Sequence, residues 1–226
     1  MRVPGLRRLG LGGWTEDPVW ASVYPWLVAH PRVGRPVWAI GIRSDLDRLY
    51  AATQEIASLP AGAALLDVPC GGGVGLRGLR PDQGLRYVAA DISPEMLKRT
   101  MSAAYAREVE DQVETHVADV ADLPFADGSF DLVASFTGLH CFPDPARAVV
   151  EMMRVLRPGG VFTGSALLND SGLQHAPVRR VGRLTGLIGP GCTSEDVQLW
   201  LHAQGGAEVT LEWSGAMAYF RAVKGS

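Results

Sequence analysis

Residues 65–78 read LLDVPCGGGVGLRG. Two leucines lead into an acid, Asp67, and then into a loop with four glycines among residues 71–75. A short apolar run bounded by such a loop is typical of a buried strand in a parallel sheet. Glycine lets the backbone come close to a ligand, because no Cβ atom is in the way. The stretch therefore predicts a strand followed by a ligand-binding loop.

The residues downstream predict an α/β fold. Strand-like apolar runs cover 63–68, 86–91, 113–119, 130–136 and 160–168. Helical patterns lie between them at 93–110, with Ser93 as N-cap, and at 144–156, which Pro158 and Gly159 should stop. Alternation of this kind predicts a parallel sheet with right-handed crossovers. A helix over 193–206 follows, and then two runs, 209–213 and 217–223, separated by three residues. So short a link predicts an antiparallel hairpin near the sheet edge.

The first sixty residues are harder to interpret. Helical spacing covers 17–30 and 44–59, with Ser44 as a candidate N-cap, and a Pro-rich connection over 30–38 separates the two segments. Aromatic residues at helical spacing, such as the tryptophans of this region, most often pack in a core. We expect residues 1–60 to form a helical extension on the substrate side. Residues 61–226 would then form the main domain.

Composition excludes several classes of protein. With 226 residues, 47% of them hydrophobic and 20% charged, the chain suits a soluble domain with a full core. Its net charge of −3 provides no overall basic field for nucleic acid. Cys70, Cys141 and Cys192 form no C-x-x-C pair, which argues against a disulfide framework or zinc site and favours a cytoplasmic location. Neither a signal peptide nor a membrane span is predicted.

Of two common nucleotide-binding motifs, the glycine loop lacks one and contains the other. A phosphate-binding P-loop needs a Gly-Lys-Ser/Thr ending, and this loop has no lysine. A dinucleotide pattern, G-x-G-x-x-G, does occur as Gly73, Gly75 and Gly78, with Asp91 downstream. NAD-dependent oxidoreduction is therefore one alternative that the loop alone leaves open.

Several ordered motifs together resemble another family. LLDVPCGGG, Asp91, HVADVADLPFADGSFDLV at 116–133 and RVLRPGGVF at 154–162 are similar to class I S-adenosylmethionine-dependent methyltransferases, in particular the small-molecule type 11 group. The resemblance implies a Rossmann-like seven-stranded sheet in the order 3-2-1-4-5-7-6, with S-adenosylmethionine at the carboxyl ends of the strands. Asp119 with the following DLPF, and the reversed last strand, separate this family from a dinucleotide fold.

The resemblance assigns roles to individual residues. Asp91 would accept hydrogen bonds from the ribose hydroxyls, and Ile92 and Met96 would flank the adenine. Asp119 would lie near the exocyclic amine of the adenine, and the Val120 amide near a ring nitrogen. Asp67 would orient the loop or meet the cofactor amine. The remaining residues assigned to the cofactor are Pro69, Cys70, Gly71, Gly73 and Phe136.

One residue departs from the family pattern. Pro69 stands where the family usually has glycine in D-x-G-x-G-x-G. Proline fixes φ near −65° and has no N–H to donate. We therefore expect the loop to differ at this point, or its contact with the cofactor to use only the carbonyl of Pro69.

The residues expected on the acceptor side favour a small, partly apolar molecule. Where exocyclic-amine nucleic-acid methyltransferases carry N/D-P-P-Y/F, this chain has Thr137 to His140, which argues against methylation of DNA or RNA amines. His140 would be the general base for a hydroxyl acceptor or would orient that acceptor; alternatively it would only pack the loop and hydrogen-bond a backbone carbonyl. The aromatic residues that would close over the cofactor are Trp14, Trp20, Tyr24 and Trp26.

Two further interpretations complete the prediction. Orienting two reactants and excluding water can carry methyl transfer, so no metal or catalytic triad is expected. Arg179, Arg180 and Arg183 suit a solvated helix face better than a phosphate site. A protein of the same fold that binds the cofactor without transferring methyl remains the other alternative.

Overall fold

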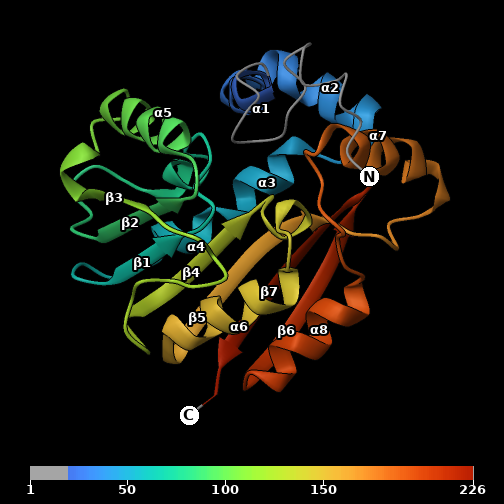
Figure 1. Ribbon diagram of the computed structural model, residues 1–226. Helices are drawn as coiled ribbons and strands as arrows, with labels where there is room; N and C mark the ends of the chain where they lie inside the picture. The colour runs from blue at the N-terminus through green and yellow to red at the C-terminus, as the bar shows by residue number, and fades with distance from the viewer. Residues whose placement is uncertain (1–19, 226) are drawn as a thin grey trace.

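The structure, a computed structural model, describes residues 20–225. Within these residues seven strands form one sheet in the order β3-β2-β1-β4-β5-β7-β6 (Figure 1). The predicted order is thus confirmed. The strands are β1 (Ala64–Asp67), β2 (Arg86–Asp91), β3 (Val113–Val117), β4 (Phe130–Phe136), β5 (Leu156–Leu167), β6 (Gly206–Ser214) and β7 (Met217–Lys224). As expected, β7 is antiparallel to its neighbours β5 and β6, and the remaining pairs are parallel.

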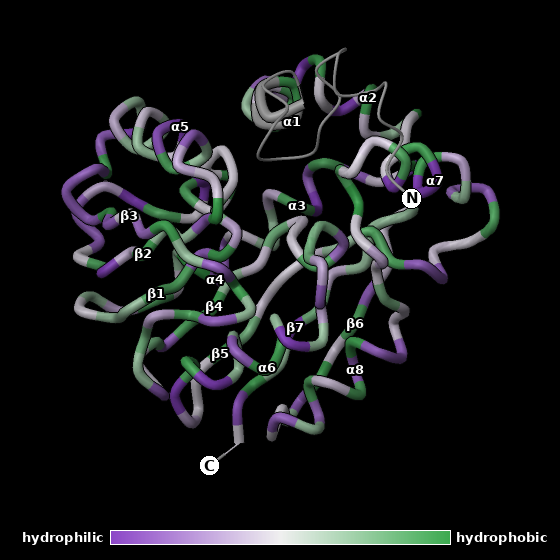
Figure 2. Tube along the Cα trace, viewed as in Figure 1, coloured by the Kyte–Doolittle hydropathy of each residue, from purple (hydrophilic) through white to green (hydrophobic). Residues whose placement is uncertain are grey.

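Helices cover both faces of the sheet and its carboxyl edge. They are α1 (Trp20–Ala29), α2 (Pro31–Ile42), α3 (Leu46–Ala52), α4 (Gln54–Ala57), α5 (Pro94–Tyr105), α6 (Pro145–Val155), α7 (Ala176–Thr185) and α8 (Ser194–Ala203). Leu66 and Val88 pack into the hydrophobic cluster on the α6 and α8 face, whereas Leu65 and Tyr87 belong to the cluster on the α3, α4 and α5 face. Successive strand residues point to opposite faces, so these strands are apolar throughout. The mixed colouring of α5 and α6 in Figure 2 is that of amphipathic helices.

The connection predicted over residues 30–38 is wrong, because these residues belong to α2. Pro31 occupies the first turn of the helix, where a missing N–H costs nothing. Pro36 lies inside the helix, which continues because Gly34 and Trp38, four residues apart, are buried on one face. The low helix propensity of proline would by itself end the helix at Pro36. Packing of α2 against α1 and α3 outweighs this effect.

The segment 44–59 also differs from the prediction. Asp45, and not Ser44, is the N-cap of α3, because its side chain accepts a hydrogen bond from the Asp47 amide at 2.9 Å. The segment is divided into α3 and α4 at Thr53, whose hydroxyl donates to the Tyr50 carbonyl at 2.7 Å. A hydrogen bond from a threonine hydroxyl to a backbone carbonyl one turn earlier competes with the backbone hydrogen bonds of a continuous helix.

Two other boundaries were predicted only in part. Helix α6 ends at Val155, before the predicted stop at Pro158, and Leu156 already begins β5 opposite Phe130. Residues 169–193 contain α7, which was not among the predicted elements. Its sequence signals are a proline within the first turn and Gly186, at φ 78°, after the last turn.

The front helices are fixed to the carboxyl edge of the sheet. Figure 1 shows α1, α2 and α7 beyond the end toward which the arrow of β4 points. The Ala216 amide, in the β6–β7 hairpin, donates to the Ile42 carbonyl at 2.9 Å. The Asp45 amide donates to the Ser214 hydroxyl at 3.0 Å. Among residues 20–225, no helix has the length and apolarity needed to cross a bilayer.

Candidate functional site

The predicted cofactor residues gather at the carboxyl edge of the sheet. Asp67 ends β1 and Asp91 ends the neighbouring β2. The loop after β1 is joined to β2 by a hydrogen bond from the Cys70 amide to the Ala90 carbonyl at 2.9 Å. It is joined to β4 by a bond from the Val68 amide to the Ala134 carbonyl, also at 2.9 Å. The glycine loop therefore lies where ligands of open α/β sheets bind, at the point where the strand order reverses.

Asp91 is a buried carboxylate held by backbone amides. Only 6% of the residue is exposed. One oxygen accepts from the Gly71 amide at 3.0 Å and the other from the Ser93 amide at 2.9 Å. Burial raises the pKa of Asp91, and the Ser93 and Gly71 amides oppose that shift. A carboxylate has about four lone-pair sites, so two remain for a ligand's hydroxyl groups.

The loop itself has the bare backbone that a ligand needs. Gly71 has φ 53°, and a Cβ placed there would meet no atom within 4 Å, so there is room beside it. Gly73 has φ 82°, and a Cβ there would come within 2.9 Å of Leu76 Cδ1. The Thr100 hydroxyl donates to the Gly71 carbonyl at 2.9 Å and so ties the loop to α5. Open space beside Gly71 and free acceptor capacity on Asp91 fit an adenosine-type cofactor.

Asp67 lies beneath the loop and is fully buried. Its Oδ2 accepts a hydrogen bond of 2.5 Å from the Tyr87 hydroxyl, and Oδ1 has no partner among the described residues. Burial raises the pKa of Asp67 to about 7, against the lowering effect of the Tyr87 hydroxyl. A Cβ on Gly75 would lie 2.6 Å from the Asp67 carboxylate and would also collide with the Tyr87 hydroxyl. No sequence motif indicated Tyr87, and Gly75 stood out only as part of the G-x-G-x-x-G pattern; both belong to the site because they contact the Asp67 carboxylate or lie directly against it.

Pro69 is the position at which the sequence predicts that the loop departs from the family pattern. The Val68–Pro69 peptide is cis. Pro69 lies against the loop after β4, because a Cβ on Gly138 would be 2.5 Å from Pro69 Cδ. Cys70 follows with a buried thiol, which accepts a hydrogen bond of 3.4 Å from the Thr100 hydroxyl. Burial raises the pKa of the Cys70 thiol well above its usual value.

The residues predicted to surround the adenine lie just beyond β2 and its neighbour β3. Ile92 is exposed at the start of α5, and Met96 is buried one turn later. Strand β3 ends at Val117, two residues before Asp119, which was predicted to end it. Asp119 is exposed and accepts from the Ala121 amide at 2.9 Å, whereas the Val120 side chain is buried. Ile92 and Asp119 are thus both exposed, just beyond the carboxyl ends of the neighbouring strands β2 and β3.

The residues after β4 form the other side of the edge. Phe136 is buried in the core at the end of β4. Thr137 has φ 56°, and its amide donates to the Ser165 hydroxyl of β5 at 3.1 Å. Non-glycine residues with positive φ concentrate at functional sites, where the surrounding structure imposes the conformation.

His140 does not have the geometry of a general base. Its Nδ1 accepts a hydrogen bond of 3.2 Å from the Leu167 amide, so the neutral ring carries its proton on Nε2. Burial lowers the pKa of His140 to about 4. Near neutral pH the residue is therefore a neutral donor through Nε2–H. This result argues against the general-base hypothesis and also differs from the alternative, in which the ring bonds a carbonyl.

The acceptor-side aromatic residues are described only in part. Trp14 lies outside the described residues, and Trp20 and Tyr24 lie in α1 with side chains outside the description. Trp26 is half exposed and stacks on His30, with ring centroids 4.5 Å apart. On the evidence of its exposure, Trp26 is available to a ligand.

Arg179 is buried, contrary to the expected solvated face. It is 8% exposed and donates to the Ser171 hydroxyl at 2.6 Å and the Gly172 carbonyl at 3.2 Å. His175, one turn earlier, is also buried, and its Nε2 has no partner among the described residues. Arg180 and Arg183 are exposed, as predicted.

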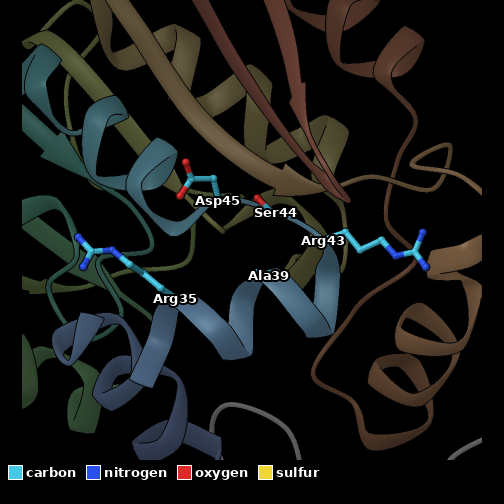
Figure 3. A pocket seen from close by; sticks show the side chains of 5 residues that line it. All are labelled: Arg35, Ala39, Arg43, Ser44 and Asp45. Carbon is cyan, nitrogen blue, oxygen red and sulfur yellow. The ribbon is translucent and has the colours of Figure 1, made fainter. Parts of the chain in front are cut away.

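An open hollow of about 380 Å³ lies beside α2. Figure 3 shows its lining residues, Arg35, Ala39, Arg43, Ser44 and Asp45. Arg35 forms a 3.0 Å ion pair with Asp47, and Arg43 extends from the other end of α2 toward α7 (Figure 3). The hollow belongs to the front helices and contains none of the predicted cofactor residues.

Comparison with known proteins is consistent with the predicted family. Residues 66–163 match the family model described as "Methyltransferase domain". The chain is 35% identical, over 60% of its length, to 27-O-demethylrifamycin SV methyltransferase of Amycolatopsis mediterranei. It is also 35% identical, over 66% of its length, to 2-methyl-6-phytyl-1,4-hydroquinone methyltransferase of Synechocystis. These matches cover 52% and 47% of the two relatives, so the chain spans about half of their length.

Among solved structures, the chain is similar to Haemonchus contortus phosphoethanolamine N-methyltransferase 2 in complex with S-adenosyl-L-methionine. The TM-score is 0.70 with 17% sequence identity, and the match covers 92% of this chain and 56% of the other. At such identity the likeness shows the shared Rossmann-like fold alone.

Proposed function

We propose that this chain, which belongs to the class I S-adenosylmethionine-dependent methyltransferases of the type 11 group, transfers a methyl group from S-adenosylmethionine to a small, partly apolar molecule. Membership of the family is the premise of the proposal. The cofactor's place, the residues that hold it and the class of acceptor are proposed on the geometry of the carboxyl edge.

The observation that carries the proposal is the pairing of Asp91 with the bare loop. The Asp91 carboxylate is already fixed by the Gly71 and Ser93 amides, and its remaining lone pairs suit the two hydroxyls of a ribose. Gly71 leaves room beside it for the methionine end of the cofactor. Ile92 and Asp119 would meet the two sides of the adenine. Asp67 takes the supporting role, because it is fully buried and holds Tyr87 beneath Gly75.

The acceptor side would work by orientation. Bound S-adenosylmethionine supplies an electrophilic methyl group on a sulfonium. His140 would hold an acceptor oxygen through its Nε2–H, and Thr137 and Trp26 would contribute to the acceptor pocket. We infer that residues 1–60 form the acceptor-side extension and residues 61–226 the methyltransferase domain. Both curated relatives are named for small-molecule acceptors, which favours such a molecule over nucleic acid here.

Ligand-induced stabilisation tests the cofactor. Binding to the native state raises the melting temperature with ligand concentration. We expect S-adenosylmethionine and S-adenosylhomocysteine to stabilise the protein and NAD to have no effect. Equal or greater stabilisation by NAD would contradict the proposal and favour oxidoreduction.

Asp91→Ala tests the site. Loss of two charge-assisted hydrogen bonds should weaken S-adenosylhomocysteine binding by about 2–4 kcal/mol, measured by calorimetric titration. The variant should also melt earlier, because the Gly71 and Ser93 amides lose their partner. Asp111→Ala removes an exposed acid before β3, at the opposite edge, and should change neither property. Unchanged affinity in Asp91→Ala would show that the ribose is held elsewhere.

Turnover separates the enzyme from a cofactor-binding protein. Methyl-labelled S-adenosylmethionine should label at least one member of a panel of phenols, quinols and amines. Cofactor binding without labelling of any of them would support the alternative without methyl transfer.

A further inference from the structure

The helices over the carboxyl edge have an unusual charge. We define the cap as residues 20–43 and 171–193, which contain α1, α2 and α7. These two segments contain six arginines and no Asp or Glu. Because the whole chain has a net charge of −3, the remaining residues carry −9. The formal charge is therefore separated between the cap and the rest of the molecule.

Large apolar side chains are exposed on the same segments. Ile40 is 83% exposed and Leu173 is 89% exposed. On α2, Val33, Val37 and Ile40 recur at spacings of four and three, so they share one face of the helix. Figure 2 shows hydrophobic and hydrophilic residues close together along α2 and α7. The exposed large apolar residues of the cap are Val23, Trp26, Val33, Val37, Ile40, Leu173, Val178, Val181 and Leu184.

Most of the cap arginines have no carboxylate partner among the described residues. Arg35 pairs with Asp47, but Arg32, Arg43 and Arg180 form no ion pair with any carboxylate of residues 20–225. Arg183 donates instead to the neutral Asn169 side chain and the Pro190 carbonyl. The surface thus combines guanidinium groups that have no carboxylate partner among residues 20–225 with exposed aliphatic side chains.

The charge and the apolar residues together select one class of partner. An anionic lipid surface takes up aliphatic side chains among its acyl chains and attracts Arg electrostatically. Nucleic acid would suit the charge, but its interfaces are more polar than this one. A second copy on a two-fold axis would bring the exposed arginines of the two caps, Arg32, Arg43, Arg180 and Arg183 of each, close together, and these like charges would repel.

We propose that the cap binds the surface of an anionic membrane. The cap is joined to the carboxyl edge through the Ala216–Ile42 hydrogen bond and through a bond of 2.8 Å from the Gly189 amide to the His140 carbonyl. Docking the cap on a bilayer therefore places that edge near the membrane surface. The proposal rests on exposure and charge and does not depend on methyl transfer, so its test needs no turnover.

Vesicle flotation tests the proposal with the full chain. Vesicles of phosphatidylcholine mixed with phosphatidylglycerol should carry the protein, whereas phosphatidylcholine alone should carry little, and added salt should release it. Each basic residue near an anionic surface is worth about fivefold in partitioning, so Arg32→Glu with Arg180→Glu should reduce binding by tenfold or more. The Ile40→Ser, Val181→Ser double variant should also bind more weakly.

Matched controls lie elsewhere on the molecule. Leu199→Ser changes an exposed leucine of α8, and Arg80→Glu reverses an exposed arginine before β2. Both should bind like the wild type, and circular dichroism should show that every variant is folded. Absence of binding to anionic vesicles, or equal losses in cap and control variants, would overturn the proposal. So would self-association that only the cap variants abolish, without vesicle binding.

Discussion

The two sides of the carboxyl edge hold their polar groups in different ways. At the ends of β1 and β2, Asp67 and Asp91 are buried acids that accept hydrogen bonds from Tyr87 and from loop amides. Beyond β4 the His140 ring is neutral and accepts a backbone hydrogen bond, and beyond β5 the exposed Asp170 carboxylate accepts from the Ser194 amide and hydroxyl. Above them the cap carries arginines without acidic partners among the described residues.

This difference suggests that the two sides of the carboxyl edge bind different kinds of partner. A site for one fixed molecule gains from groups that are already oriented, because less order has to be imposed on binding. The acid side, which we define as the ends of β1 and β2 with Asp67 and Asp91, has such oriented groups. The cap, by contrast, leaves arginine donors and apolar side chains exposed. Such a surface suits contact with a partner that has no single fixed structure, such as a membrane.

The largest expected effect is the pH dependence that Asp67 gives to stability. Its pKa is raised from 3.8 to about 7, so the folded protein holds this proton more tightly than the unfolded chain. The contribution of Asp67 to the free energy of unfolding is fully present below about pH 4. It decreases by about 4 kcal/mol as the pH rises from 4 to 7. We expect Asp67→Asn to remove this decline, measured as the difference in unfolding free energy from the wild type in urea at each pH. If the unfolding free energies of Asp67→Asn and the wild type differ by the same amount at every pH, Asp67 does not have the raised pKa of a buried acid.

His140 should contribute with the opposite sign. Its pKa is lowered from 6.5 to about 4, so the unfolded chain binds the proton more tightly. The stability is present above pH 6.5 and is lost as the pH falls toward 4, by at most about 3 kcal/mol. In the wild type the two slopes oppose each other, and His140→Gln should expose the slope of Asp67. Histidine NMR should show an Nε2–H ring that titrates below pH 5. Titration near 6.5 would return His140 to the role of a possible base.

The smallest effect is steric and compares two glycines. Gly75→Ala places a methyl group against the buried Asp67–Tyr87 pair, and overpacking of this kind costs about 1–3 kcal/mol. Gly41→Ala, in α2 of the cap, meets no atom within 4 Å. The second variant should be stabilised by about 0.5–1 kcal/mol through helix propensity. Thermal melts of both proteins measure the contrast, and equal effects would mean that the acid side is no more tightly packed than the cap.

The sequence predicted the sheet well and the front of the chain poorly. The parallel strands are continuous apolar runs bounded by turn residues, so local pattern sufficed for their extent. The reversed last pair followed from a three-residue link. At 30–38, Pro31 and Pro36 indicated a connection, but burial of Gly34 and Trp38 made the segment helical. For Arg179, helix-face reasoning could not foresee the Ser171 and Gly172 partners that bury it.

The sequence by itself determined the fold class, the strand order through family resemblance, and which acids end β1 and β2. Those features depend on apolar periodicity and on motifs of neighbouring residues, which a linear chain displays directly. Only the tertiary structure decided what each acid contacts. Tyr87 reaches Asp67 from the neighbouring strand, and the Leu167 amide reaches His140 across 27 residues. The pKa values and proton positions of these groups depend on burial and on partners distant in sequence, and neither exists before the chain has folded.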